Sequence, residues 1–333
     1  MLASPMAVEI RRPLDAGLDG DDPAVAFALL ESGRQRGIDG VLITIVGVDG
    51  GAPRTPGSHM AVLADGSYVG YISGGCVEAS VAAEALSVLD SGKDAVLRFG
   101  RNSPFMDIRL PCGGGIDLHM HVRPDPQVVS GALDAMARRE SFAIDLVPKA
   151  GTATLVRGTD PGGPSDWRNG AFRRRYLPRT RLALVGRGLE FEAMMRVGRA
   201  AGLDVAAFSP DDHALAVAGS LALPATRLVS LGHVPPLPVD RWTAVVFLFH
   251  DHDWESALLG QALATDAFFI GALGSTRTQA RRREHLAKVG FTEAQIERVR
   301  GPIGLFGPTR DSVSLTLSVL GEIASERIAA EAE

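Results

Sequence analysis

The first half of the chain alternates short apolar runs with turns rich in glycine and proline. The β-branched run at residues 41–48, VLITIVGV, predicts a buried strand. Residues 60–63 and 68–72 are apolar on either side of Asp65-Gly66, and this dipeptide between two apolar runs predicts a hairpin. Apolar residues at helical spacing after Pro23 predict a helix that ends at Gly37.

The same pattern continues to residue 156. The alanine-rich stretch at residues 77–89 predicts a helix whose N-terminus lies at Cys76. Residues 126–156 predict a helix and two strands, FAIDLV and TATLV, which we expect to complete a mixed sheet. Two further strands are expected at residues 95–99 and 116–122.

The second half has a different pattern, in which strands and helices alternate regularly. A strand at residues 181–185 leads to the glycine loop 186–188, a helix that ends at Ala201 and a second strand at 205–208. This order is typical of a βαβ unit. We therefore expect a doubly wound parallel sheet, continued by strands 244–249 and 268–270 and by helices 253–263, 277–289 and 309–329.

These patterns, in a chain of 333 residues, predict an α/β protein of two domains. Residues 1–22 carry no periodic apolar pattern and are expected to be a flexible leader. A mixed α/β domain is expected at 23–156 and a Rossmann-like domain at 181–333. Residues 157–180 are rich in Gly, Pro, Asp and Arg, and we interpret them as the linker.

Composition narrows the class of protein. Apolar residues make up 46% of the chain and charged residues 22%, which is typical of a globular protein. The net charge is -5 and there is no run of Lys or Arg, so nucleic-acid binding is not expected. There is no signal-peptide pattern and no apolar run long enough to cross a membrane, which predicts a cytoplasmic protein.

The chain has two cysteines, and both lie beside glycines. Cys76 follows Gly74-Gly75, precedes Glu78 by two positions and lies at a predicted helix start, where amides and the helix dipole favour a thiolate or an anionic ligand. Cys112 precedes Gly113-Gly114. The two thiols could converge on a soft or electrophilic ligand, or they could be two small buried residues.

Arg54 and two histidines are further candidates in this half. Arg54 lies in a turn stiffened by glycine and proline, where its guanidinium could hold a phosphate or carboxylate, or could simply be exposed. His119 and His121 alternate along a strand and so point to one face. Because no carboxylate motif accompanies them, we expect a hydrogen-bonded or solvated pair rather than a metal site.

Gly186-Arg187-Gly188 resembles the start of a dinucleotide fingerprint. The third glycine position is Phe191, whose side chain would oppose close helix–strand packing, and Glu190 would repel a phosphate. The acid expected after the second strand is displaced, since Ser209 ends that strand and Asp211 follows two positions later. A Rossmann-like fold is therefore predicted more clearly than nicotinamide binding.

Two more segments follow predicted parallel strands, at the edge where open α/β sheets bind ligands. His250-Asp251 comes directly after the strand at 244–249, and His252 follows; a helix cap with solvated neighbours is the alternative. A second glycine turn, at residues 271–277, could hold an anion. Residues 281–283, three arginines, are expected to form a largely solvated helix face.

Taken in order, these motifs resemble the xanthine dehydrogenase accessory (XdhC/CoxI) family over nearly the whole chain. The first half carries PRTPGSHM, ISGGCVE and PCGGGID. The second half carries LALVGRG, FLFHDHDWESALL, FIGALGSTRTQARRREHL and GPIGL. Several ordered motifs are more specific than one glycine loop.

The resemblance implies a chaperone of the molybdenum cofactor rather than a turnover enzyme. Such a protein binds the cofactor, protects it while a cysteine desulfurase supplies the terminal sulfido ligand, and inserts it into a molybdenum hydroxylase of the xanthine dehydrogenase type. Cys76 would be the contact to molybdenum. With the patterns above, the implied cofactor-binding residues are Cys76, Cys112, Gly74, Gly75, Glu78, Arg54, Gly113, Gly114, Gly186, Arg187, Gly188, His250, Asp251, Gly271, Gly274, Ser275 and Arg277.

Alternatives stay open at this stage. A NAD(P)-dependent oxidoreductase would use residues 186–188 and an acid or base at His250. An assembly adaptor would bind the client enzyme through its surface alone. The sequence leaves open the client, the mononucleotide or dinucleotide form of the cofactor, and whether the chain forms a homodimer.

Overall fold

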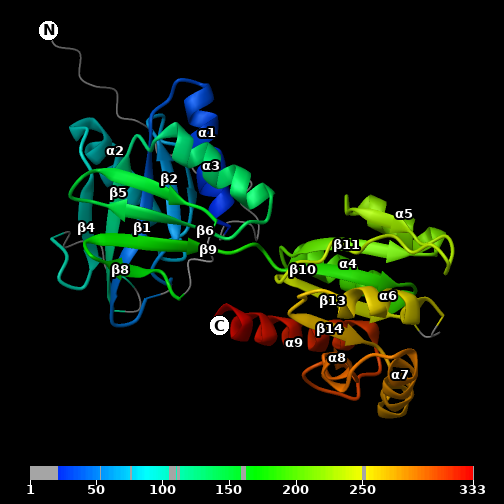
Figure 1. Cartoon of the computed structure of the whole chain (residues 1–333). Helices are drawn as coiled ribbons and strands as arrows, with labels where there is room; N and C mark the ends of the chain where they lie inside the picture. The colour runs from blue at the N-terminus through cyan, green and yellow to red at the C-terminus, as the bar shows by residue number, and fades with distance from the viewer. Residues whose placement is uncertain are drawn as a thin grey trace, which may run out of the picture. The chain divides into compact units, whose positions relative to one another are not determined.

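The computed structural model describes residues 22–52, 54–75, 77–104, 110, 113–158, 163–249 and 253–332. The chain divides into two compact units, one that ends at Pro178 and one that begins at Arg179 (Figure 1). The predicted leader lies almost entirely outside the described residues. In the part of the chain that the structure describes, no helix combines the length and the apolar character needed to cross a membrane.

The N-terminal unit is built on a five-stranded antiparallel sheet of order β3-β2-β1-β5-β4. The hairpin predicted at Asp65-Gly66 is confirmed, and Gly66 adopts a positive φ of 82° there. The strands are β1 (Gly40–Asp49), β2 (His59–Leu63), β3 (Tyr68–Gly70), β4 (Ala95–Gly100) and β5 (Gly115–Val122).

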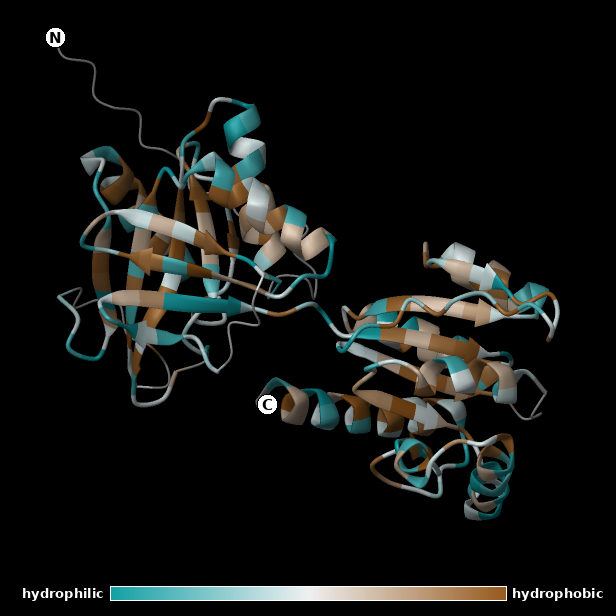
Figure 2. Cartoon of the chain, in the orientation of Figure 1, coloured by the Kyte–Doolittle hydropathy of each residue, from teal (hydrophilic) through white to brown (hydrophobic). Residues whose placement is uncertain are grey.

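The central strand β1 is buried from Gly40 to Val46, and its residues there are apolar except Thr44, because both faces of the sheet are covered. Helix α2 (Glu78–Ser91) packs on the face that carries Ile43. Helices α1 (Pro23–Gln35) and α3 (Pro126–Ala137) pack on the opposite side, where Leu42 is buried. Figure 2 shows the apolar residues concentrated in the strands of this sheet.

A second antiparallel sheet, of order β7-β6-β9-β8, completes the N-terminal unit. The expectation that residues 142–156 would complete one mixed sheet is therefore wrong, since they pair in a separate antiparallel one. The strands are β6 (Phe142–Val147), β7 (Thr152–Val156), β8 (Asp166–Arg168) and β9 (Ala171–Tyr176).

The linker predicted at 157–180 is also wrong over β8 and β9. Its arginines suggested a solvated segment, but Arg173 pairs with Asp145 on the neighbouring strand, with nitrogen and oxygen 2.6 Å apart. Phe172 and Tyr176 of β9 are buried in the same core as α1 and α3. The cross-strand ion pair and the buried rings make this polar segment part of the domain.

The C-terminal unit is a six-stranded parallel sheet of order β12-β11-β10-β13-β14-β15. Counted along the chain this is 3-2-1-4-5-6, the order of a doubly wound Rossmann-type sheet. The predicted fold class is thus confirmed. The strands are β10 (Arg181–Gly186), β11 (Asp204–Ser209), β12 (Ala225–Arg227), β13 (Thr243–Leu248), β14 (Phe269–Ala272) and β15 (Val299–Arg300).

Helices cover both faces of this sheet (Figure 1). One core contains residues of α4, α5 and α9, and the other contains residues of α6, α7 and α8. The helices are α4 (Leu189–Ala200), α5 (Asp212–Ser220), α6 (Asp253–Leu263), α7 (Thr276–Val289), α8 (Glu293–Glu297) and α9 (Ser312–Ala332).

Phe191 does not oppose helix–strand packing as its size suggested. It is fully buried beside Met194 and Met195 in the core under α4. The close approach between helix and sheet occurs at Gly198 instead, where an added Cβ would lie 3.0 Å from the Leu182 side chain. The helix therefore accommodates a bulky residue in its first turn because a glycine lies two turns later.

Arg282 departs from the expected solvated face at 281–283, because only 5% of it is exposed. Its guanidinium forms two hydrogen bonds to the buried carboxylate of Glu255 on α6, through Nε and Nη2. Nη2 also donates to the Leu273 carbonyl at 2.8 Å. This ion pair joins α6, α7 and the loop after β14.

Replacing Glu255 by Ala is expected to destabilise the C-terminal unit by about 3–5 kcal/mol, because it leaves a buried guanidinium without its charge partner. Urea unfolding can be followed by tryptophan fluorescence in a Trp167→Phe background, since the other two tryptophans, Trp242 and Trp254, lie in this unit. The matched control is Glu293→Ala, which removes the exposed partner of Arg283 and should cost less than about 1 kcal/mol. Equal losses of unfolding free energy in Glu255→Ala and Glu293→Ala would contradict the conclusion that the buried ion pair stabilises this unit more than the exposed one.

Candidate functional site

The loop before α2 carries the glycine pair that precedes Cys76. Gly74 and Gly75 are exposed and have positive φ values of 89° and 108°. No described atom lies within 4 Å of a Cβ placed on either residue, so the backbone conformation rather than crowding requires glycine. Cys76 itself lies outside the described residues.

Glu78, the first residue of α2, holds this loop in place. Its carboxylate accepts hydrogen bonds from the backbone amides of Ser73 at 2.8 Å, Val77 at 3.1 Å and Ile72 at 3.2 Å. The Ser73 hydroxyl donates to the same carboxylate. With 3% of the residue exposed, Glu78 acts as a brace for the backbone around Cys76, a different role from the predicted contact with a ligand.

The charge of Glu78 is stabilised where it lies. Burial alone would raise the pKa of its carboxyl, but the hydrogen bonds from the backbone amides of Ser73 and its neighbours and from the Ser73 hydroxyl outweigh burial and lower that pKa below its usual value. The helix dipole also favours a negative charge in the first turn of α2. The loop is therefore fastened by an ionised group at neutral pH.

The glycine loop before β5 is packed against the loop after β1. A Cβ on Gly114 would lie 1.9 Å from the Gly51 carbonyl oxygen, so only glycine fits there. The Arg101 amide donates to the Gly114 carbonyl at 2.8 Å, and Arg101 Nε donates to the Gly113 carbonyl at 3.1 Å. Gly114 is held by close packing and Gly113 by the hydrogen bond from Arg101, and Cys112 lies outside the described residues.

The segments that flank the two cysteines lie on one buried cluster. Ile72 and Val77 flank Cys76, and Leu110 lies two residues before Cys112. All three belong to the cluster beneath α2, and Ala52, from the loop after β1, packs against it. The structure thus brings the loop after β1 to the same cluster as the segments that flank the two cysteines.

Arg54 lines a small cavity of ≈ 60 Å³ together with Arg174 of β9. Ser58, His59 and Tyr71 also line it. Asp22 lines the same cavity, so an anion there would meet one acid as well as two guanidinium groups. Arg174 was missed because its strand was interpreted as the linker. The available signal was the apolar and aromatic residues on either side of the three arginines in AFRRRY.

His59 is buried between Thr44 and Tyr176. Its Nδ1 lies 3.0 Å from the Thr44 hydroxyl, and its Nε2 is hydrogen-bonded to the Tyr176 hydroxyl. Burial, reinforced by the charge of Arg174, lowers the pKa of His59 to about 3, so the imidazole is neutral at physiological pH. Burial raises the pKa of Tyr176, which keeps its hydroxyl protonated.

In the C-terminal unit, loops that carry the predicted site residues meet at the carboxyl edge of the sheet. A Cβ on Gly186 would lie 2.6 Å from the Leu248 carbonyl oxygen, and the Arg187 amide donates to the same oxygen at 3.4 Å. The Leu273 amide donates to the Phe247 carbonyl oxygen at 2.8 Å. His250, Asp251 and His252, which follow Leu248 and Phe249, lie outside the described residues.

The two helix starts at this edge differ in charge. Gly188, with a φ of 87°, precedes α4, whose first turn contains Glu190 and Glu192. Ser275 caps α7 by accepting from the Thr278 amide at 3.2 Å, and the first turn of α7 contains no acid. An anion therefore suits the start of α7 better than the start of α4.

In the second glycine turn, at residues 271–277, some residues are packed against the core and others are exposed. Gly271 is a packing residue, because a Cβ there would lie 2.5 Å from the Phe269 ring. Gly274 has a φ of 144°, and Arg277 is exposed in the first turn of α7. Among the predicted site residues of this turn, Ser275 and Arg277 are thus the exposed ones.

Asp211, the first acid after β11, is the N-cap residue of α5. Its carboxylate accepts from the Ala214 amide at 2.8 Å and caps α5, while its own amide donates to the Ser209 hydroxyl at 3.1 Å. An acid that binds the ribose of a dinucleotide needs a free carboxylate after the second strand. The acid that follows β11 here is engaged as a helix cap.

Replacing Glu78 by Gln is expected to destabilise the loop by about 1–3 kcal/mol, because a neutral amide cannot replace the charge-assisted bonds from the loop amides. The measurement is hydrogen–deuterium exchange of residues 72–78 at pH 7, with unfolding at pH 7 and pH 4. Since the folded-state pKa of Glu78 is lowered, its stabilisation is present above about 4.3, the ordinary Glu value, and is lost as pH falls further. Glu84→Gln, on the same helix, should leave the exchange unchanged.

Known proteins resemble this chain over most of its length. The chain is 34% identical over 317 residues to the molybdenum cofactor insertion chaperone PaoD of Escherichia coli strain K12, covering 95% of this chain and 92% of that protein. A crystal structure described as a xanthine dehydrogenase from Bacillus halodurans matches with a TM-score of 0.69 over 91% of this chain and 96% of the other. At 17% identity, that match supports the fold alone.

Two family domains match in the order in which the units occur. The XdhC and CoxI family domain matches residues 33–100, which include the brace at Glu78. The XdhC Rossmann domain matches residues 182–323, which cover nearly all of the parallel sheet. With these matches and the full-length relative, the chain belongs to the XdhC and CoxI family.

Proposed function

We propose that this protein is a chaperone that binds the molybdenum cofactor and inserts it into a molybdenum hydroxylase of the xanthine dehydrogenase type. The observation that carries the proposal is the 34% identity to a molybdenum cofactor insertion chaperone over 95% of this chain. Between binding and insertion, the protein would protect the cofactor while a cysteine desulfurase supplies its sulfido ligand. This work would take place in the cytoplasm.

The loops of the N-terminal unit supply chemistry that suits this cargo. The backbone around Cys76 is fastened by the Glu78 carboxylate, and its exposed glycines leave room for a ligand to approach. A thiolate is a soft ligand that suits molybdenum. We assign the molybdenum contact to Cys76 and a supporting role to Cys112.

The anionic groups of the cofactor need separate partners. In the N-terminal unit, the cavity lined by Arg54 and Arg174 offers two guanidinium groups. In the C-terminal unit, the start of α7 offers backbone amides, Ser275 and Arg277 without a competing acid. We propose that the phosphate groups of the mononucleotide or dinucleotide form bind at such positions.

A second candidate function follows from the strand order of the C-terminal sheet. A 3-2-1-4-5-6 parallel sheet with Gly188 before α4 is the arrangement that binds NAD(P) in many dehydrogenases. Two observations oppose it here: the first turn of α4, which a pyrophosphate would approach, contains Glu190 and Glu192, and the Asp211 carboxylate caps α5. A maturation chaperone therefore accounts for more of the structure than a turnover enzyme.

Replacing Cys76 by Ala should weaken cofactor binding by about tenfold or more, which corresponds to about 1.4 kcal/mol. The full-length protein is purified with its bound small molecules, and the pterin content is measured by mass spectrometry after release. The wild-type protein should carry one cofactor per chain. The matched control, Ser87→Ala on the exposed side of α2, should keep that content.

Unchanged cofactor content in both Cys76→Ala and Cys112→Ala would remove the thiols from the mechanism while leaving the chaperone function standing. No cofactor on the wild-type protein, together with capture of the hydroxylase client, would favour an adaptor instead. A homodimer is the expected assembly, and a light-scattering mass of one chain would contradict it.

Calorimetric titration of the full-length protein with NAD(H) and NADP(H) is expected to show no binding at millimolar ligand, because the first turn of α4 presents two carboxylates to the pyrophosphate. A Glu190→Gln/Glu192→Gln variant, which lacks both carboxylates, tests whether their charge prevents binding. Binding by the variant alone would support the electrostatic explanation. Micromolar binding by the wild-type protein would instead restore the oxidoreductase alternative.

A further inference from the structure

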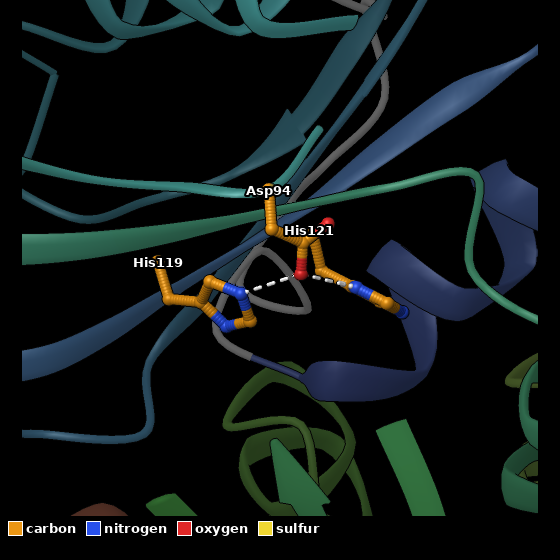
Figure 3. Close-up of side chains that lie close together, drawn as sticks. All are labelled: Asp94, His119 and His121. Atoms are coloured by element: carbon orange, nitrogen blue, oxygen red, sulfur yellow. Dashed lines mark hydrogen bonds and ion pairs between the residues drawn. The ribbon is translucent and has the colours of Figure 1, made fainter. Parts of the chain in front are cut away.

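Three side chains that the proposed function does not use meet at one edge of the first sheet in the N-terminal unit. Asp94 lies just before β4, and His119 and His121 alternate along β5 (Figure 3). Oδ2 of Asp94 lies 2.8 Å from His119 Nε2 and 2.8 Å from His121 Nδ1. The carboxylate that the sequence analysis did not find beside these histidines is therefore present, supplied by the neighbouring strand.

The three side chains are buried but close to the surface. Their exposed fractions are 3% for Asp94, 0% for His119 and 5% for His121. In the sheet, His119 pairs with Thr44 and His121 with Leu42 of β1. Next to Asp94 is Gly151, whose added Cβ would lie 3.8 Å from the Asp94 Cγ. A small ion could reach the carboxylate from the rim of the sheet.

The Asp94 carboxylate is held in place by the backbone. Its Oδ1 accepts a hydrogen bond from the Val122 amide at 3.0 Å, which leaves Oδ2 for the two imidazoles. The fold therefore fixes the position of the oxygen that both histidines share.

One atom of the cluster is not satisfied by the fold. Among the described residues, the buried Nδ1 of His119 has no hydrogen-bond partner. A buried polar atom without a partner costs about 1–3 kcal/mol, and such a group in a native structure calls for an explanation. Because no donor among the described residues occupies Nδ1, the ring proton of His119 can move there and leave Nε2 with a lone pair for an ion.

We propose that Asp94, His119 and His121 form a binding site for a first-row divalent metal ion of the zinc type, which goes beyond the proposed cofactor chaperone. One ligand atom from each residue can be chosen so that all three lie within 4.8 Å of one another. Two imidazoles and one carboxylate suit zinc, whereas calcium and magnesium prefer oxygen ligands. Three protein ligands leave a fourth position for water.

The three ligand atoms lie within 4.8 Å of one another, so the side chains must shift to coordinate one ion. Tetrahedral ligands at about 2.0–2.1 Å from zinc lie about 3.3 Å apart, compared with 2.8 Å between Oδ2 and each nitrogen here. In the hydrogen-bonded state, Nε2 of His119 and Nδ1 of His121 each carry a proton that points at Asp94. On metal binding each proton moves to the other nitrogen of its own ring. The lone pairs that remain on His119 Nε2 and His121 Nδ1 then bind the ion.

The wild-type full-length protein, freed of metal by a chelator, is titrated with Co²⁺ as a spectroscopic substitute for zinc. We expect one equivalent to bind with the visible absorption of a tetrahedral nitrogen and oxygen site. X-ray absorption of the zinc-loaded protein should show imidazole ligands at about 2.0–2.1 Å. A sulfur shell, or thiolate charge-transfer bands in the cobalt spectrum, would place the ion on the cysteines and overturn the proposal.

Asp94→Asn, His119→Gln and His121→Gln should each weaken zinc affinity by at least the 10–100-fold that losing an outer-shell partner costs. The matched control is His213→Gln, because His213 is exposed on α5 in the other unit. Circular dichroism and thermal unfolding of the metal-free variants check that each is folded. If a variant does not fold, X-ray absorption of the wild-type protein still tests the proposal. Folded variants that keep wild-type zinc affinity, or a wild-type protein that binds no zinc, would overturn the proposal. The cluster would then only join β4 to β5 through hydrogen bonds.

Discussion

Burial of β1 on both faces is the constraint on which the N-terminal unit depends. A strand covered by α2 on one side and by α1, α3 and the second sheet on the other must be apolar on both. Any polar group that lies on these faces needs a partner inside the protein. Glu78, His59 and the cluster around Asp94 are the results, and each binds a specific neighbour rather than water.

This constraint links the fold to the proposed cofactor site. The loop around Cys76 is exposed, yet the carboxylate that shapes it is buried and bound to three of its amides. A loop held in this way can present a thiol without losing its conformation when the ligand leaves. For a chaperone that must both bind and release its cargo, an ordered loop reduces the entropy lost on each binding event.

The parallel sheet of the C-terminal unit brings its loops together for a different reason. Parallel strands end at the same edge, so the loops after β10, β13 and β14 meet there whatever their sequences. The charges in the first helical turns then decide what can bind. Two glutamates at the start of α4 and none at the start of α7 favour an anion at the second position.

The sequence by itself determined the fold class, most strands and helices, and the family, because apolar periodicity and glycine motifs are local signals. It also located the glycine loops around Cys76, Gly114, Gly188 and Gly274, since such turns demand residues that tolerate unusual backbone or close contact. Boundaries were good to a few residues, as at α9, which begins at Ser312 rather than at 309.

Only the tertiary structure decided which polar residues meet. Asp94 is 25 residues from His119, and Arg174 is 120 residues from Arg54, so no local pattern could pair them. The same limit explains the errors: β9 was interpreted as a linker because its partner Asp145 lies on another strand, and Arg282 was expected in solvent because Glu255 lies on another helix. The energy of a buried charge depends on what stands beside it in space, and that neighbour is set by the fold.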